Sequence, residues 1–286
     1  MKPCAFIYHR PSGLPEALAL LAAHAPTGGR VLAGGQSLVP MMAYRMAQPS
    51  HLIDINHIAT LQGAAMQNGA LVIGTTTRHA AFKTGICPGP LGAMLGFVSS
   101  HIAHGPIRNR GTFGGSLANA DPASEWCLVM VTLGGRVMLQ HASGTRMVAA
   151  GDFFTGVMAT ALADDEMLTE AHLPWGQGDQ WGFYEISRRA GDYALAMCLV
   201  VYRLDNGLMR DVRLGIGGAE ATPRRLAAAE AILAGQAPTG PNFIQAADAA
   251  AAMLKPMTDH NVTALFRRDL VRAAVRRALH HSLNHE

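Results

Sequence analysis

Two adjacent glycines, Gly34 and Gly35, follow a short apolar segment over residues 31–33 and precede Gln36 and Ser37. Because glycine has no Cβ atom, such a loop can turn sharply and bring its backbone N–H groups close to an anion. A diphosphate group would fit this geometry. A glycine pair after a strand is also typical of an ordinary turn, so this motif alone leaves both interpretations open.

A second, longer segment, residues 107–122, reads IRNRGTFGGSLANADP. It combines another glycine pair with the hydroxyls of Thr112 and Ser116 and the carboxylate of Asp121. The segment is rich in hydrogen-bonding groups and poor in side chains that could fill a core. This composition favours a ligand-binding loop over a plain surface loop, although both remain open. Neither motif has the spacing of a Rossmann dinucleotide site or of a P-loop.

The overall composition argues against several function classes. The chain has 286 residues, 49% of them hydrophobic, and a formal net charge of +3 from 23 basic and 20 acidic residues. No block of like charge suggests nucleic-acid binding, and no apolar run approaches the roughly 20 residues of a membrane span. The N-terminus lacks the apolar run of a signal peptide, so we expect a cytoplasmic protein that binds small molecules or other proteins.

The spacing of cysteine and histidine argues against a metal centre on this chain. The cysteines Cys4, Cys87, Cys127 and Cys198 are far apart and form no C-x-x-C pair. We therefore expect no zinc site, iron–sulfur cluster or disulfide framework here. His101 and His104 could share one helix face, but no third ligand is evident nearby, so we expect no metal site there either.

Apolar periodicity and turn signals divide the chain into three units, residues 1–55, 56–175 and 176–286. The first is predicted to be a small α/β unit, and the second opens with a hairpin at Asn68 and Gly69. The last boundary lies in the segment 174–179, which is rich in proline and glycine.

The third unit is predicted to contain a three-stranded meander followed by helices. The strands are expected over residues 181–188, 194–204 and 209–217, and the helices over 223–233, 242–254 and 259–283. In the last helix an apolar residue recurs every four positions, which predicts a buried stripe. Its members are Val262, Phe266, Leu270, Ala274 and Ala278.

The two glycine motifs together resemble the FAD-binding medium subunits of the molybdenum hydroxylase, or xanthine dehydrogenase, family. Examples are the medium subunits of aerobic carbon monoxide dehydrogenase and of bacterial N-heterocycle hydroxylases. The resemblance also covers residues 187–194, 211–214 and 266–268, and so spans nearly the whole chain. Phe113 and Gln36 stand where many members have Ile and His. These departures keep the glycine geometry, but they imply a different electronic tuning of the flavin. Gln36, with His104 ahead of the second motif, resembles the N-heteroaromatic branch of the family more than carbon monoxide dehydrogenase.

The resemblance implies an α+β fold: a two-part FAD-binding domain of the vanillyl-alcohol-oxidase-like type, then a C-terminal domain of a three-stranded antiparallel sheet and a helical bundle. It also implies one FAD, bound non-covalently. The implied cofactor contacts are Ala33, Gly34, Gly35, Gln36, Ser37 and Leu38 at the diphosphate, Thr112, Gly114, Gly115 and Ser116 in a facing loop, Asn119 and Asp121 at the ribityl or diphosphate region, and Leu168 and Tyr193 near the isoalloxazine ring. From the residues alone, Tyr193 and Leu168 could equally be core residues.

The resemblance further implies electron transfer, with no catalytic residue on this chain. The expected partners are a large subunit with the molybdenum cofactor and a small subunit with [2Fe-2S] clusters, assembled as a dimer of heterotrimers. Electrons would pass from the clusters through FAD to an external acceptor, and the complex would hydroxylate an N-heteroaromatic or similar small substrate. Two alternatives are a self-sufficient FAD oxidase or reductase of the same fold and a non-catalytic scaffold subunit.

Overall fold

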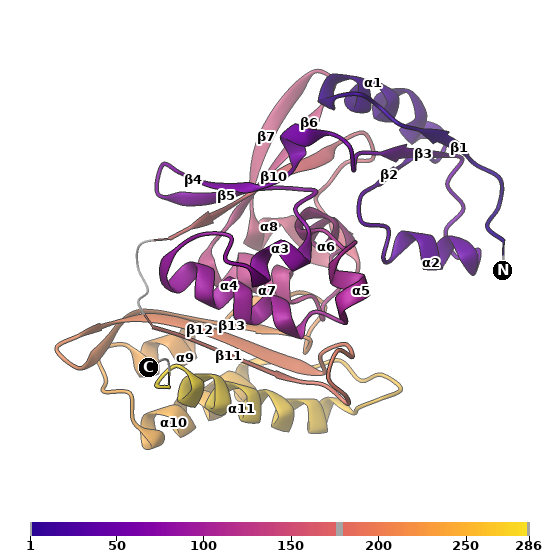
Figure 1. Ribbon diagram of the computed structural model, residues 1–286. Coiled ribbons are helices and arrows are strands. Elements are labelled where there is room, and N and C mark those ends of the chain that lie inside the picture. Colours follow the sequence, from indigo (N-terminus) through magenta and orange to yellow (C-terminus); the bar gives the residue numbers. More distant parts are fainter. Residues whose placement is uncertain (1, 176–179, 285–286) are drawn as a thin grey trace.

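The computed structural model describes residues 2–175 and 180–284 and contains three main sheets with helices against them (Figure 1). Residues 176–179, within the segment predicted to separate the last two units, lie outside the described residues. Each predicted unit contains one main sheet, while the limits of the units stay predictions. Among the described helices, none is long and apolar enough to cross a membrane.

A parallel sheet of strand order β1-β3-β2 forms the N-terminal unit. Its strands are β1 (Ile7–His9), β2 (Arg30–Leu32) and β3 (His51–Asp54). Parallel neighbours require crossover connections, which contain α1 (Leu14–His24) and α2 (Leu38–Ala43). Ala17 and Leu21 on α1 pack with Ile53 of β3 in a small core, which seats the helix on the sheet.

The second sheet is antiparallel, with the order β4-β5-β10-β6-β7. Its strands are β4 (Ala64–Gln67), β5 (Ala70–Gly74), β6 (Arg136–His141), β7 (Gly144–Ala149) and β10 (Met167–Pro174). The first hairpin turns at Asn68 and Gly69 with φ of 49° and 76°, the positive angles that an Asn-Gly pair predicts.

Helices connect the strands of the second sheet and pack beneath it in Figure 1. Between β5 and β6 the chain forms α3 (His79–Lys83), α4 (Gly89–His101), α5 (Gly105–Arg108), α6 (Phe113–Asn119) and α7 (Glu125–Leu133). Between β7 and β10 lie α8 (Ala150–Phe153) and the small hairpin of β8 (Phe154–Gly156) and β9 (Ala159–Thr160). The second glycine motif therefore occupies α5, α6 and the turn between them.

The C-terminal sheet is an antiparallel meander, as predicted, with one short addition. Its long strands are β11 (Gln180–Ile186), β12 (Ala196–Asp205) and β13 (Leu208–Gly217), and β14 (Arg224–Arg225) pairs with β13 as a fourth strand. The helices are α9 (Ala227–Leu233), α10 (Gly240–Met253) and α11 (Ala264–His281). The helix predicted from residue 223 thus begins later, because residues 224–225 pair with the sheet edge first.

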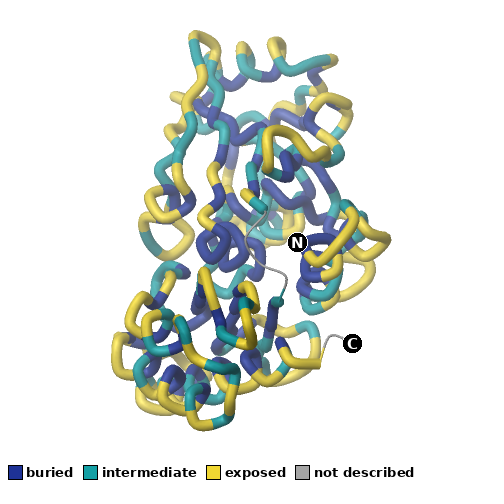
Figure 2. Tube along the Cα trace, turned by 90° about the vertical axis from the view of Figure 1, so that its left-hand side faces the viewer, coloured by how far each residue is buried: buried dark blue, intermediate teal, exposed yellow. Residues whose placement is uncertain are grey.

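Both faces of the C-terminal sheet are buried, which is why its strands read as apolar runs. Successive residues of β12 point to opposite faces and enter two different cores. Met197, Leu199 and Val201 pack with α4 and α7, whereas Ala196, Cys198, Val200 and Tyr202 pack with α9, α10 and α11. Figure 2 draws the buried stretches of the chain in dark blue. The sheet therefore fixes the C-terminal domain against α4 and α7, the helices that precede and follow the second glycine motif in the chain.

The predicted stripe on the last helix is only partly buried. Ala274 and Ala278 are fully buried, but Phe266 is 55% exposed. An α-helix turns by 3.6 residues, so a repeat of exactly four residues drifts away from the core face within a few turns. Val271, Val275 and Leu279 are also buried, so the real core face repeats every three to four residues, as a helix requires.

We expect a large loss of stability when Gly182 is replaced by alanine. A Cβ atom at this position of β11 would lie 1.9 Å from the Ala278 carbonyl oxygen and 2.9 Å from the Ser282 nitrogen, both backbone atoms of the packed C-terminal segment. Backbone cannot rotate away, so we expect Gly182→Ala to destabilise the protein by about 3 kcal/mol or more. Urea unfolding measures this difference. Gly240→Ala, where a Cβ meets no atom within 4 Å, is the control, and equal midpoints for both variants would contradict the packing described.

Candidate functional site

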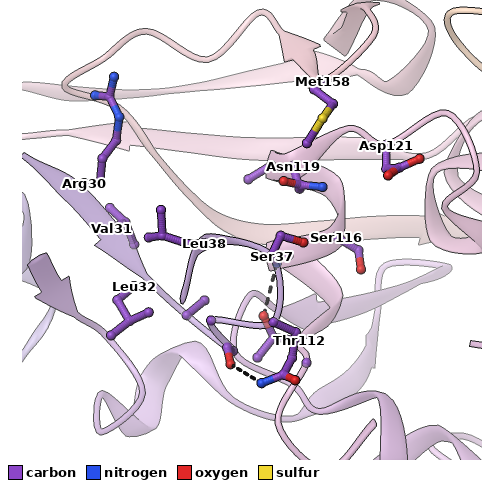
Figure 3. A pocket seen from close by; sticks show the side chains of 18 of the residues that line it. Arg30, Val31, Leu32, Ser37, Leu38, Thr112, Ser116, Asn119, Asp121 and Met158 are labelled. Carbon is purple, nitrogen blue, oxygen red and sulfur yellow. Dashed lines mark hydrogen bonds between the residues drawn. The ribbon is translucent and has the colours of Figure 1, made fainter. Parts of the chain in front are cut away.

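The two glycine motifs face each other across one cavity of about 970 Å³. The first motif is the loop between β2 and α2, and the second runs into α6. Every cofactor contact implied by the sequence lies in the cavity lining: Ala33, Gly34, Gly35, Gln36, Ser37, Leu38, Thr112, Gly114, Gly115, Ser116, Asn119, Asp121, Leu168 and Tyr193. Figure 3 shows several of these side chains around the opening. The volume is at the upper end of small-molecule pockets, which suits a ligand as large as a dinucleotide.

Close contacts with other segments explain two of the glycines. A Cβ atom on Gly34 would lie 2.4 Å from the Arg110 carbonyl oxygen and 2.7 Å from the Gly111 Cα, so this glycine lets the two loops touch through their backbones. A Cβ atom on Gly114 would lie 1.8 Å from the hydroxyl oxygen of Thr75, the residue after β5. Gly34 therefore sets the distance between the two loops, and Gly114 lets α6 pack against the end of β5.

The first loop offers backbone donors to a ligand. Gly35 has φ of +72°, a left-handed conformation that glycine adopts without strain. Within the described part of the chain, the N–H groups of Gly34, Gly35, Gln36 and Ser37 donate no hydrogen bond to protein. Gly34 is buried and Gly35 and Ser37 are half-buried, and N–H groups that are shielded in this way are costly unless water or a ligand accepts from them. The loop is therefore fitted to hold an anion.

The backbone N–H groups of the second loop donate to other protein atoms. The Thr112 hydroxyl caps α6 by accepting from the Gly115 N–H at 3.1 Å, and Gly114 donates to the Thr75 carbonyl at 3.0 Å. What remains for a ligand is side chains: Ser116, Asn119 and Asp121 lie along the cavity in Figure 3. The two motifs thus have different roles, with backbone donors on one side and polar side chains on the other.

A polar network that sequence reasoning missed joins the two loops. The Asn56 amide donates to the Ala33 carbonyl at 2.7 Å, and the Arg78 guanidinium donates to the Asn56 amide oxygen at 2.7 Å. Arg78 also donates to the Arg110 carbonyl in the second motif. The two residues therefore connect the loops through charge-assisted hydrogen bonds. Their sequence surroundings give no sign of this, because the contacts join distant segments.

Tyr193 and Leu168 occupy different parts of the lining. Tyr193 lies in the loop between β11 and β12 and is 74% exposed, so it is not a core residue. Its loop is held beside the second motif at Gly191, where φ is +86° and a Cβ would lie 2.4 Å from the His104 ring. Leu168 is buried in β10 and packs in the main core while its edge reaches the cavity.

Further lining residues were not predicted from the sequence. They include Arg30 and Val31 on β2, Met158 and Thr160 at the small β8–β9 hairpin, and Glu125 at the start of α7. Arg30 forms an ion pair with Asp164 at 3.5 Å across the opening. The sequence could have suggested Arg30 only because β2 directly precedes the first loop. The residues of the β8–β9 hairpin reach the cavity through tertiary folding, which no local pattern predicts.

A pair of buried carboxyl groups adjoins the cavity. Glu125 and Glu185 share a hydrogen bond, and burial, followed by the charge of Glu185, raises the pKa of Glu125 well above its usual 4.5. Burial also raises the pKa of Glu185 to about 7. Two carboxylates cannot both be ionised cheaply at this spacing, so the pair holds a proton at neutral pH.

This pair predicts a pH dependence of stability. Because the folded-state pKa values are raised, the folded protein keeps a proton that the unfolded chain releases near pH 4.5. This contribution to stability is therefore complete below pH 4.5 and is lost as pH rises from there through the raised pKa values of the folded state, about 7 for Glu185. The melting temperature of Glu125→Gln is therefore expected to fall less than that of wild type between about pH 5 and pH 8. Asp165→Asn, at an exposed position, is the control. Parallel pH profiles for all three proteins would contradict the shared proton.

The lining also bears on whether a cofactor could be attached covalently. None of Cys4, Cys87, Cys127 and Cys198 lines the cavity. His79 does, but its Nδ1 accepts a hydrogen bond from the Trp126 indole N–H at 2.9 Å. Burial lowers the pKa of His79 to about 4, with Arg78 and Arg108 adding to the effect, so this ring is neutral and structural.

Comparison of the sequence with protein families identifies the kind of site that this cavity is. Residues 4–176 match the FAD binding domain in molybdopterin dehydrogenase, and residues 181–282 match the CO dehydrogenase flavoprotein C-terminal domain. The chain is an FAD-binding subunit of the molybdenum hydroxylase family. Both glycine motifs fall within the first match, and the three-stranded meander and its helices fall within the second.

Individual relatives match along the whole chain. The medium subunit of nicotine 6-hydroxylase from Paenarthrobacter nicotinovorans is 36% identical, with 98% of each chain covered. Among solved structures, carbon monoxide dehydrogenase from Hydrogenophaga pseudoflava gives a TM-score of 0.92 at 35% identity, covering 99% of both chains. Quinoline 2-oxidoreductase from Pseudomonas putida 86 gives a TM-score of 0.92 at 33% identity, covering 99% of this chain and 98% of that chain.

Proposed function

We propose that this chain holds one FAD non-covalently in the cavity between its glycine motifs and serves as the electron-transfer subunit of a molybdenum-dependent hydroxylase. The observation that carries the proposal is the set of N–H groups at residues 34–37, which donate to no protein atom among the described residues and face polar side chains of the second motif across the cavity. Neutral donors of this kind bind a diphosphate without a lysine or arginine. The absence of a cysteine from the lining supports non-covalent binding.

Each predicted contact then has a role in binding. The N–H groups of residues 34–37 donate to the diphosphate, with Ala33 and Leu38 flanking it. Thr112, Gly114 and Gly115 shape the facing loop, and Ser116, Asn119 and Asp121 bind the ribityl or diphosphate region. Leu168 lies under the ring system, and the exposed Tyr193 places its ring against the isoalloxazine face, where aromatic stacking is favourable.

In this proposal the chain places the flavin, limits access to it and leaves it open to the electron acceptor. FAD accepts electrons singly and gives them up in pairs, which matches one-electron iron–sulfur donors to a two-electron acceptor. The chain's own residues fix the distance between the two loops, limit access at Tyr193 and keep the His79 ring neutral. We assign no catalytic residue to the chain. Its partners are a large molybdenum subunit and a small iron–sulfur subunit in a dimer of heterotrimers, and an external acceptor takes the electrons.

For the substrate of the complex, we propose an N-heteroaromatic compound. Nicotine 6-hydroxylase and quinoline 2-oxidoreductase, both similar to this chain along its full length, are named for such compounds. Carbon monoxide dehydrogenase is about equally similar, so the proposal rests also on Gln36 and His104, which resemble the N-heteroaromatic branch. The chain itself would not touch the substrate.

Purification from the native source through a tag on this chain tests the assignment. We expect two further chains, molybdenum, iron and one FAD per tagged chain, and bleaching of the visible spectrum when an N-heteroaromatic substrate is added. Recovery of the tagged chain alone with FAD, reduced directly by an organic compound, would instead identify a self-sufficient flavoenzyme. Recovery with partners but without FAD would identify a scaffold subunit.

A further inference from the structure

Three histidines outside the cavity meet at one edge of the N-terminal sheet. His9 ends β1, His24 ends α1 and His51 begins β3. One ring nitrogen from each lies within 4.8 Å of the other two, and His9 Nε2 is 2.8 Å from His51 Nδ1. The expectation of no metal site rested on the cysteines and on His101 and His104. These three histidines were not part of it, since they are 15 and 27 positions apart and belong to no spacing motif.

The backbone fixes where the rings meet. The parallel register pairs Ile7 with His51, so His9, two residues further along β1, lies on the same face as His51. The end of α1 brings the His24 ring onto His51, with ring centroids 3.8 Å apart. Gly29 holds that helix end: its N–H donates to the His24 carbonyl at 2.8 Å, and a Cβ there would lie 2.9 Å from the His24 Cβ.

The ring nitrogens suit a divalent ion. Two nitrogens at 2.8 Å require one proton between them, because two lone pairs would repel. A zinc ion bonded at about 2.0–2.1 Å in tetrahedral geometry places two ligand nitrogens about 3.3 Å apart, so replacing that proton needs only a small opening. The rings are now nearly parallel, with interplanar angles of 10° to 22°, and must turn about their soft χ2 torsions to aim at one ion. All three are half-buried, which leaves room to turn.

We propose that His9, His24 and His51 bind one borderline divalent metal ion such as Zn²⁺, with water in the fourth position. Imidazole nitrogen is a preferred ligand of such ions. The carbonyl end of α1 lies at His24, where the helix dipole favours a cation. The ion would join β1, α1 and β3. Because Gly28 and Gly29 follow α1 and line the cavity before β2, the ion would brace the unit that carries the first glycine loop.

Zinc binding by the full-length, FAD-loaded chain tests this proposal. After removal of metals with a chelator, the chain is dialysed against Zn²⁺ and its metal content is measured. We expect one Zn²⁺ per chain at low micromolar metal, together with a higher melting temperature. His24→Ala should weaken this binding by roughly tenfold or more, since loss of an outer partner of a metal ligand alone costs about 10–100-fold.

Two further variants make the test specific. His51→Gln keeps a polar side chain in the sheet and should lose zinc like His24→Ala. His260→Ala removes an exposed histidine far along the chain and should bind zinc like wild type. Flavin absorbance of each variant reports whether the N-terminal unit is intact. The proposal is overturned if wild type takes up no zinc, or if folded His24→Ala and His51→Gln retain it with unchanged affinity.

Discussion

A Gly34→Ala subunit is expected to lose most of its FAD while the rest of the chain stays folded. The added methyl would lie 2.4 Å from the Arg110 carbonyl oxygen and 2.7 Å from the Gly111 Cα. Because both are backbone atoms, the two loops must separate, which costs about 1–3 kcal/mol for a single added methyl group. If this cost falls on the bound state, affinity drops roughly 5- to 150-fold. Titration of the FAD-depleted subunit with FAD, followed by flavin fluorescence, measures the change.

Gly151→Ala is the matched control for this substitution. Gly151 lies in α8, and a Cβ there meets no atom within 4 Å. We expect this variant to bind FAD like wild type. Wild-type affinity in Gly34→Ala would show that the loop contact does not set the cofactor site, and would contradict the geometry described above.

The second large effect is expected from a negative charge at Ser37. Ser37 stands at the N-cap position of α2, but its side chain makes no capping hydrogen bond, so Ser37→Asp removes no such contact and should preserve the fold. A carboxylate about 4 Å from a phosphate charge is repelled by about 4 kcal/mol at an effective dielectric constant near 20. Solvent at the cavity mouth reduces this value, and we expect FAD affinity to fall at least about a hundredfold.

Thr263→Asp adds the same charge at another helix N-cap. Thr263 caps α11 by accepting from the Phe266 N–H at 3.3 Å, away from the cavity. This variant should keep wild-type FAD affinity, and isothermal titration of both proteins gives the comparison. Equal affinities for the two variants would place the diphosphate elsewhere than at the first loop.

Local sequence patterns predicted the elements well where one interaction decides the conformation. Asn68 and Gly69 adopt the positive φ angles of a tight hairpin turn, and Pro15 stands in the first turn of α1. The meander of β11, β12 and β13 follows from apolar runs separated by turn residues. The residues of both glycine motifs line one cavity because short, polar, glycine-rich loops have little else to pack against.

Features that depend on tertiary contact were missed. Asn56 and Arg78 join the loops only because β3 and α3 are folded together, and neither residue belongs to a motif. In the sequence Glu125 is only a carboxylate at the start of a helix, and the fold alone brings Glu185 of β11 next to it. Phe266 fits the apolar repeat yet is exposed, since the repeat of four departs from the helical period. Sequence spacing describes neighbours along one element, whereas these contacts join different ones.

Single-turnover reduction of the flavin tests the central claim most directly. The native complex and the isolated FAD-loaded chain are mixed anaerobically with the same N-heteroaromatic substrate, and flavin absorbance is followed. We expect reduction in the complex and none in the isolated chain, because electrons reach this FAD only through the partner subunits. Reduction of the isolated chain at the rate seen in the complex would show that the chain oxidises the substrate itself and would contradict the account.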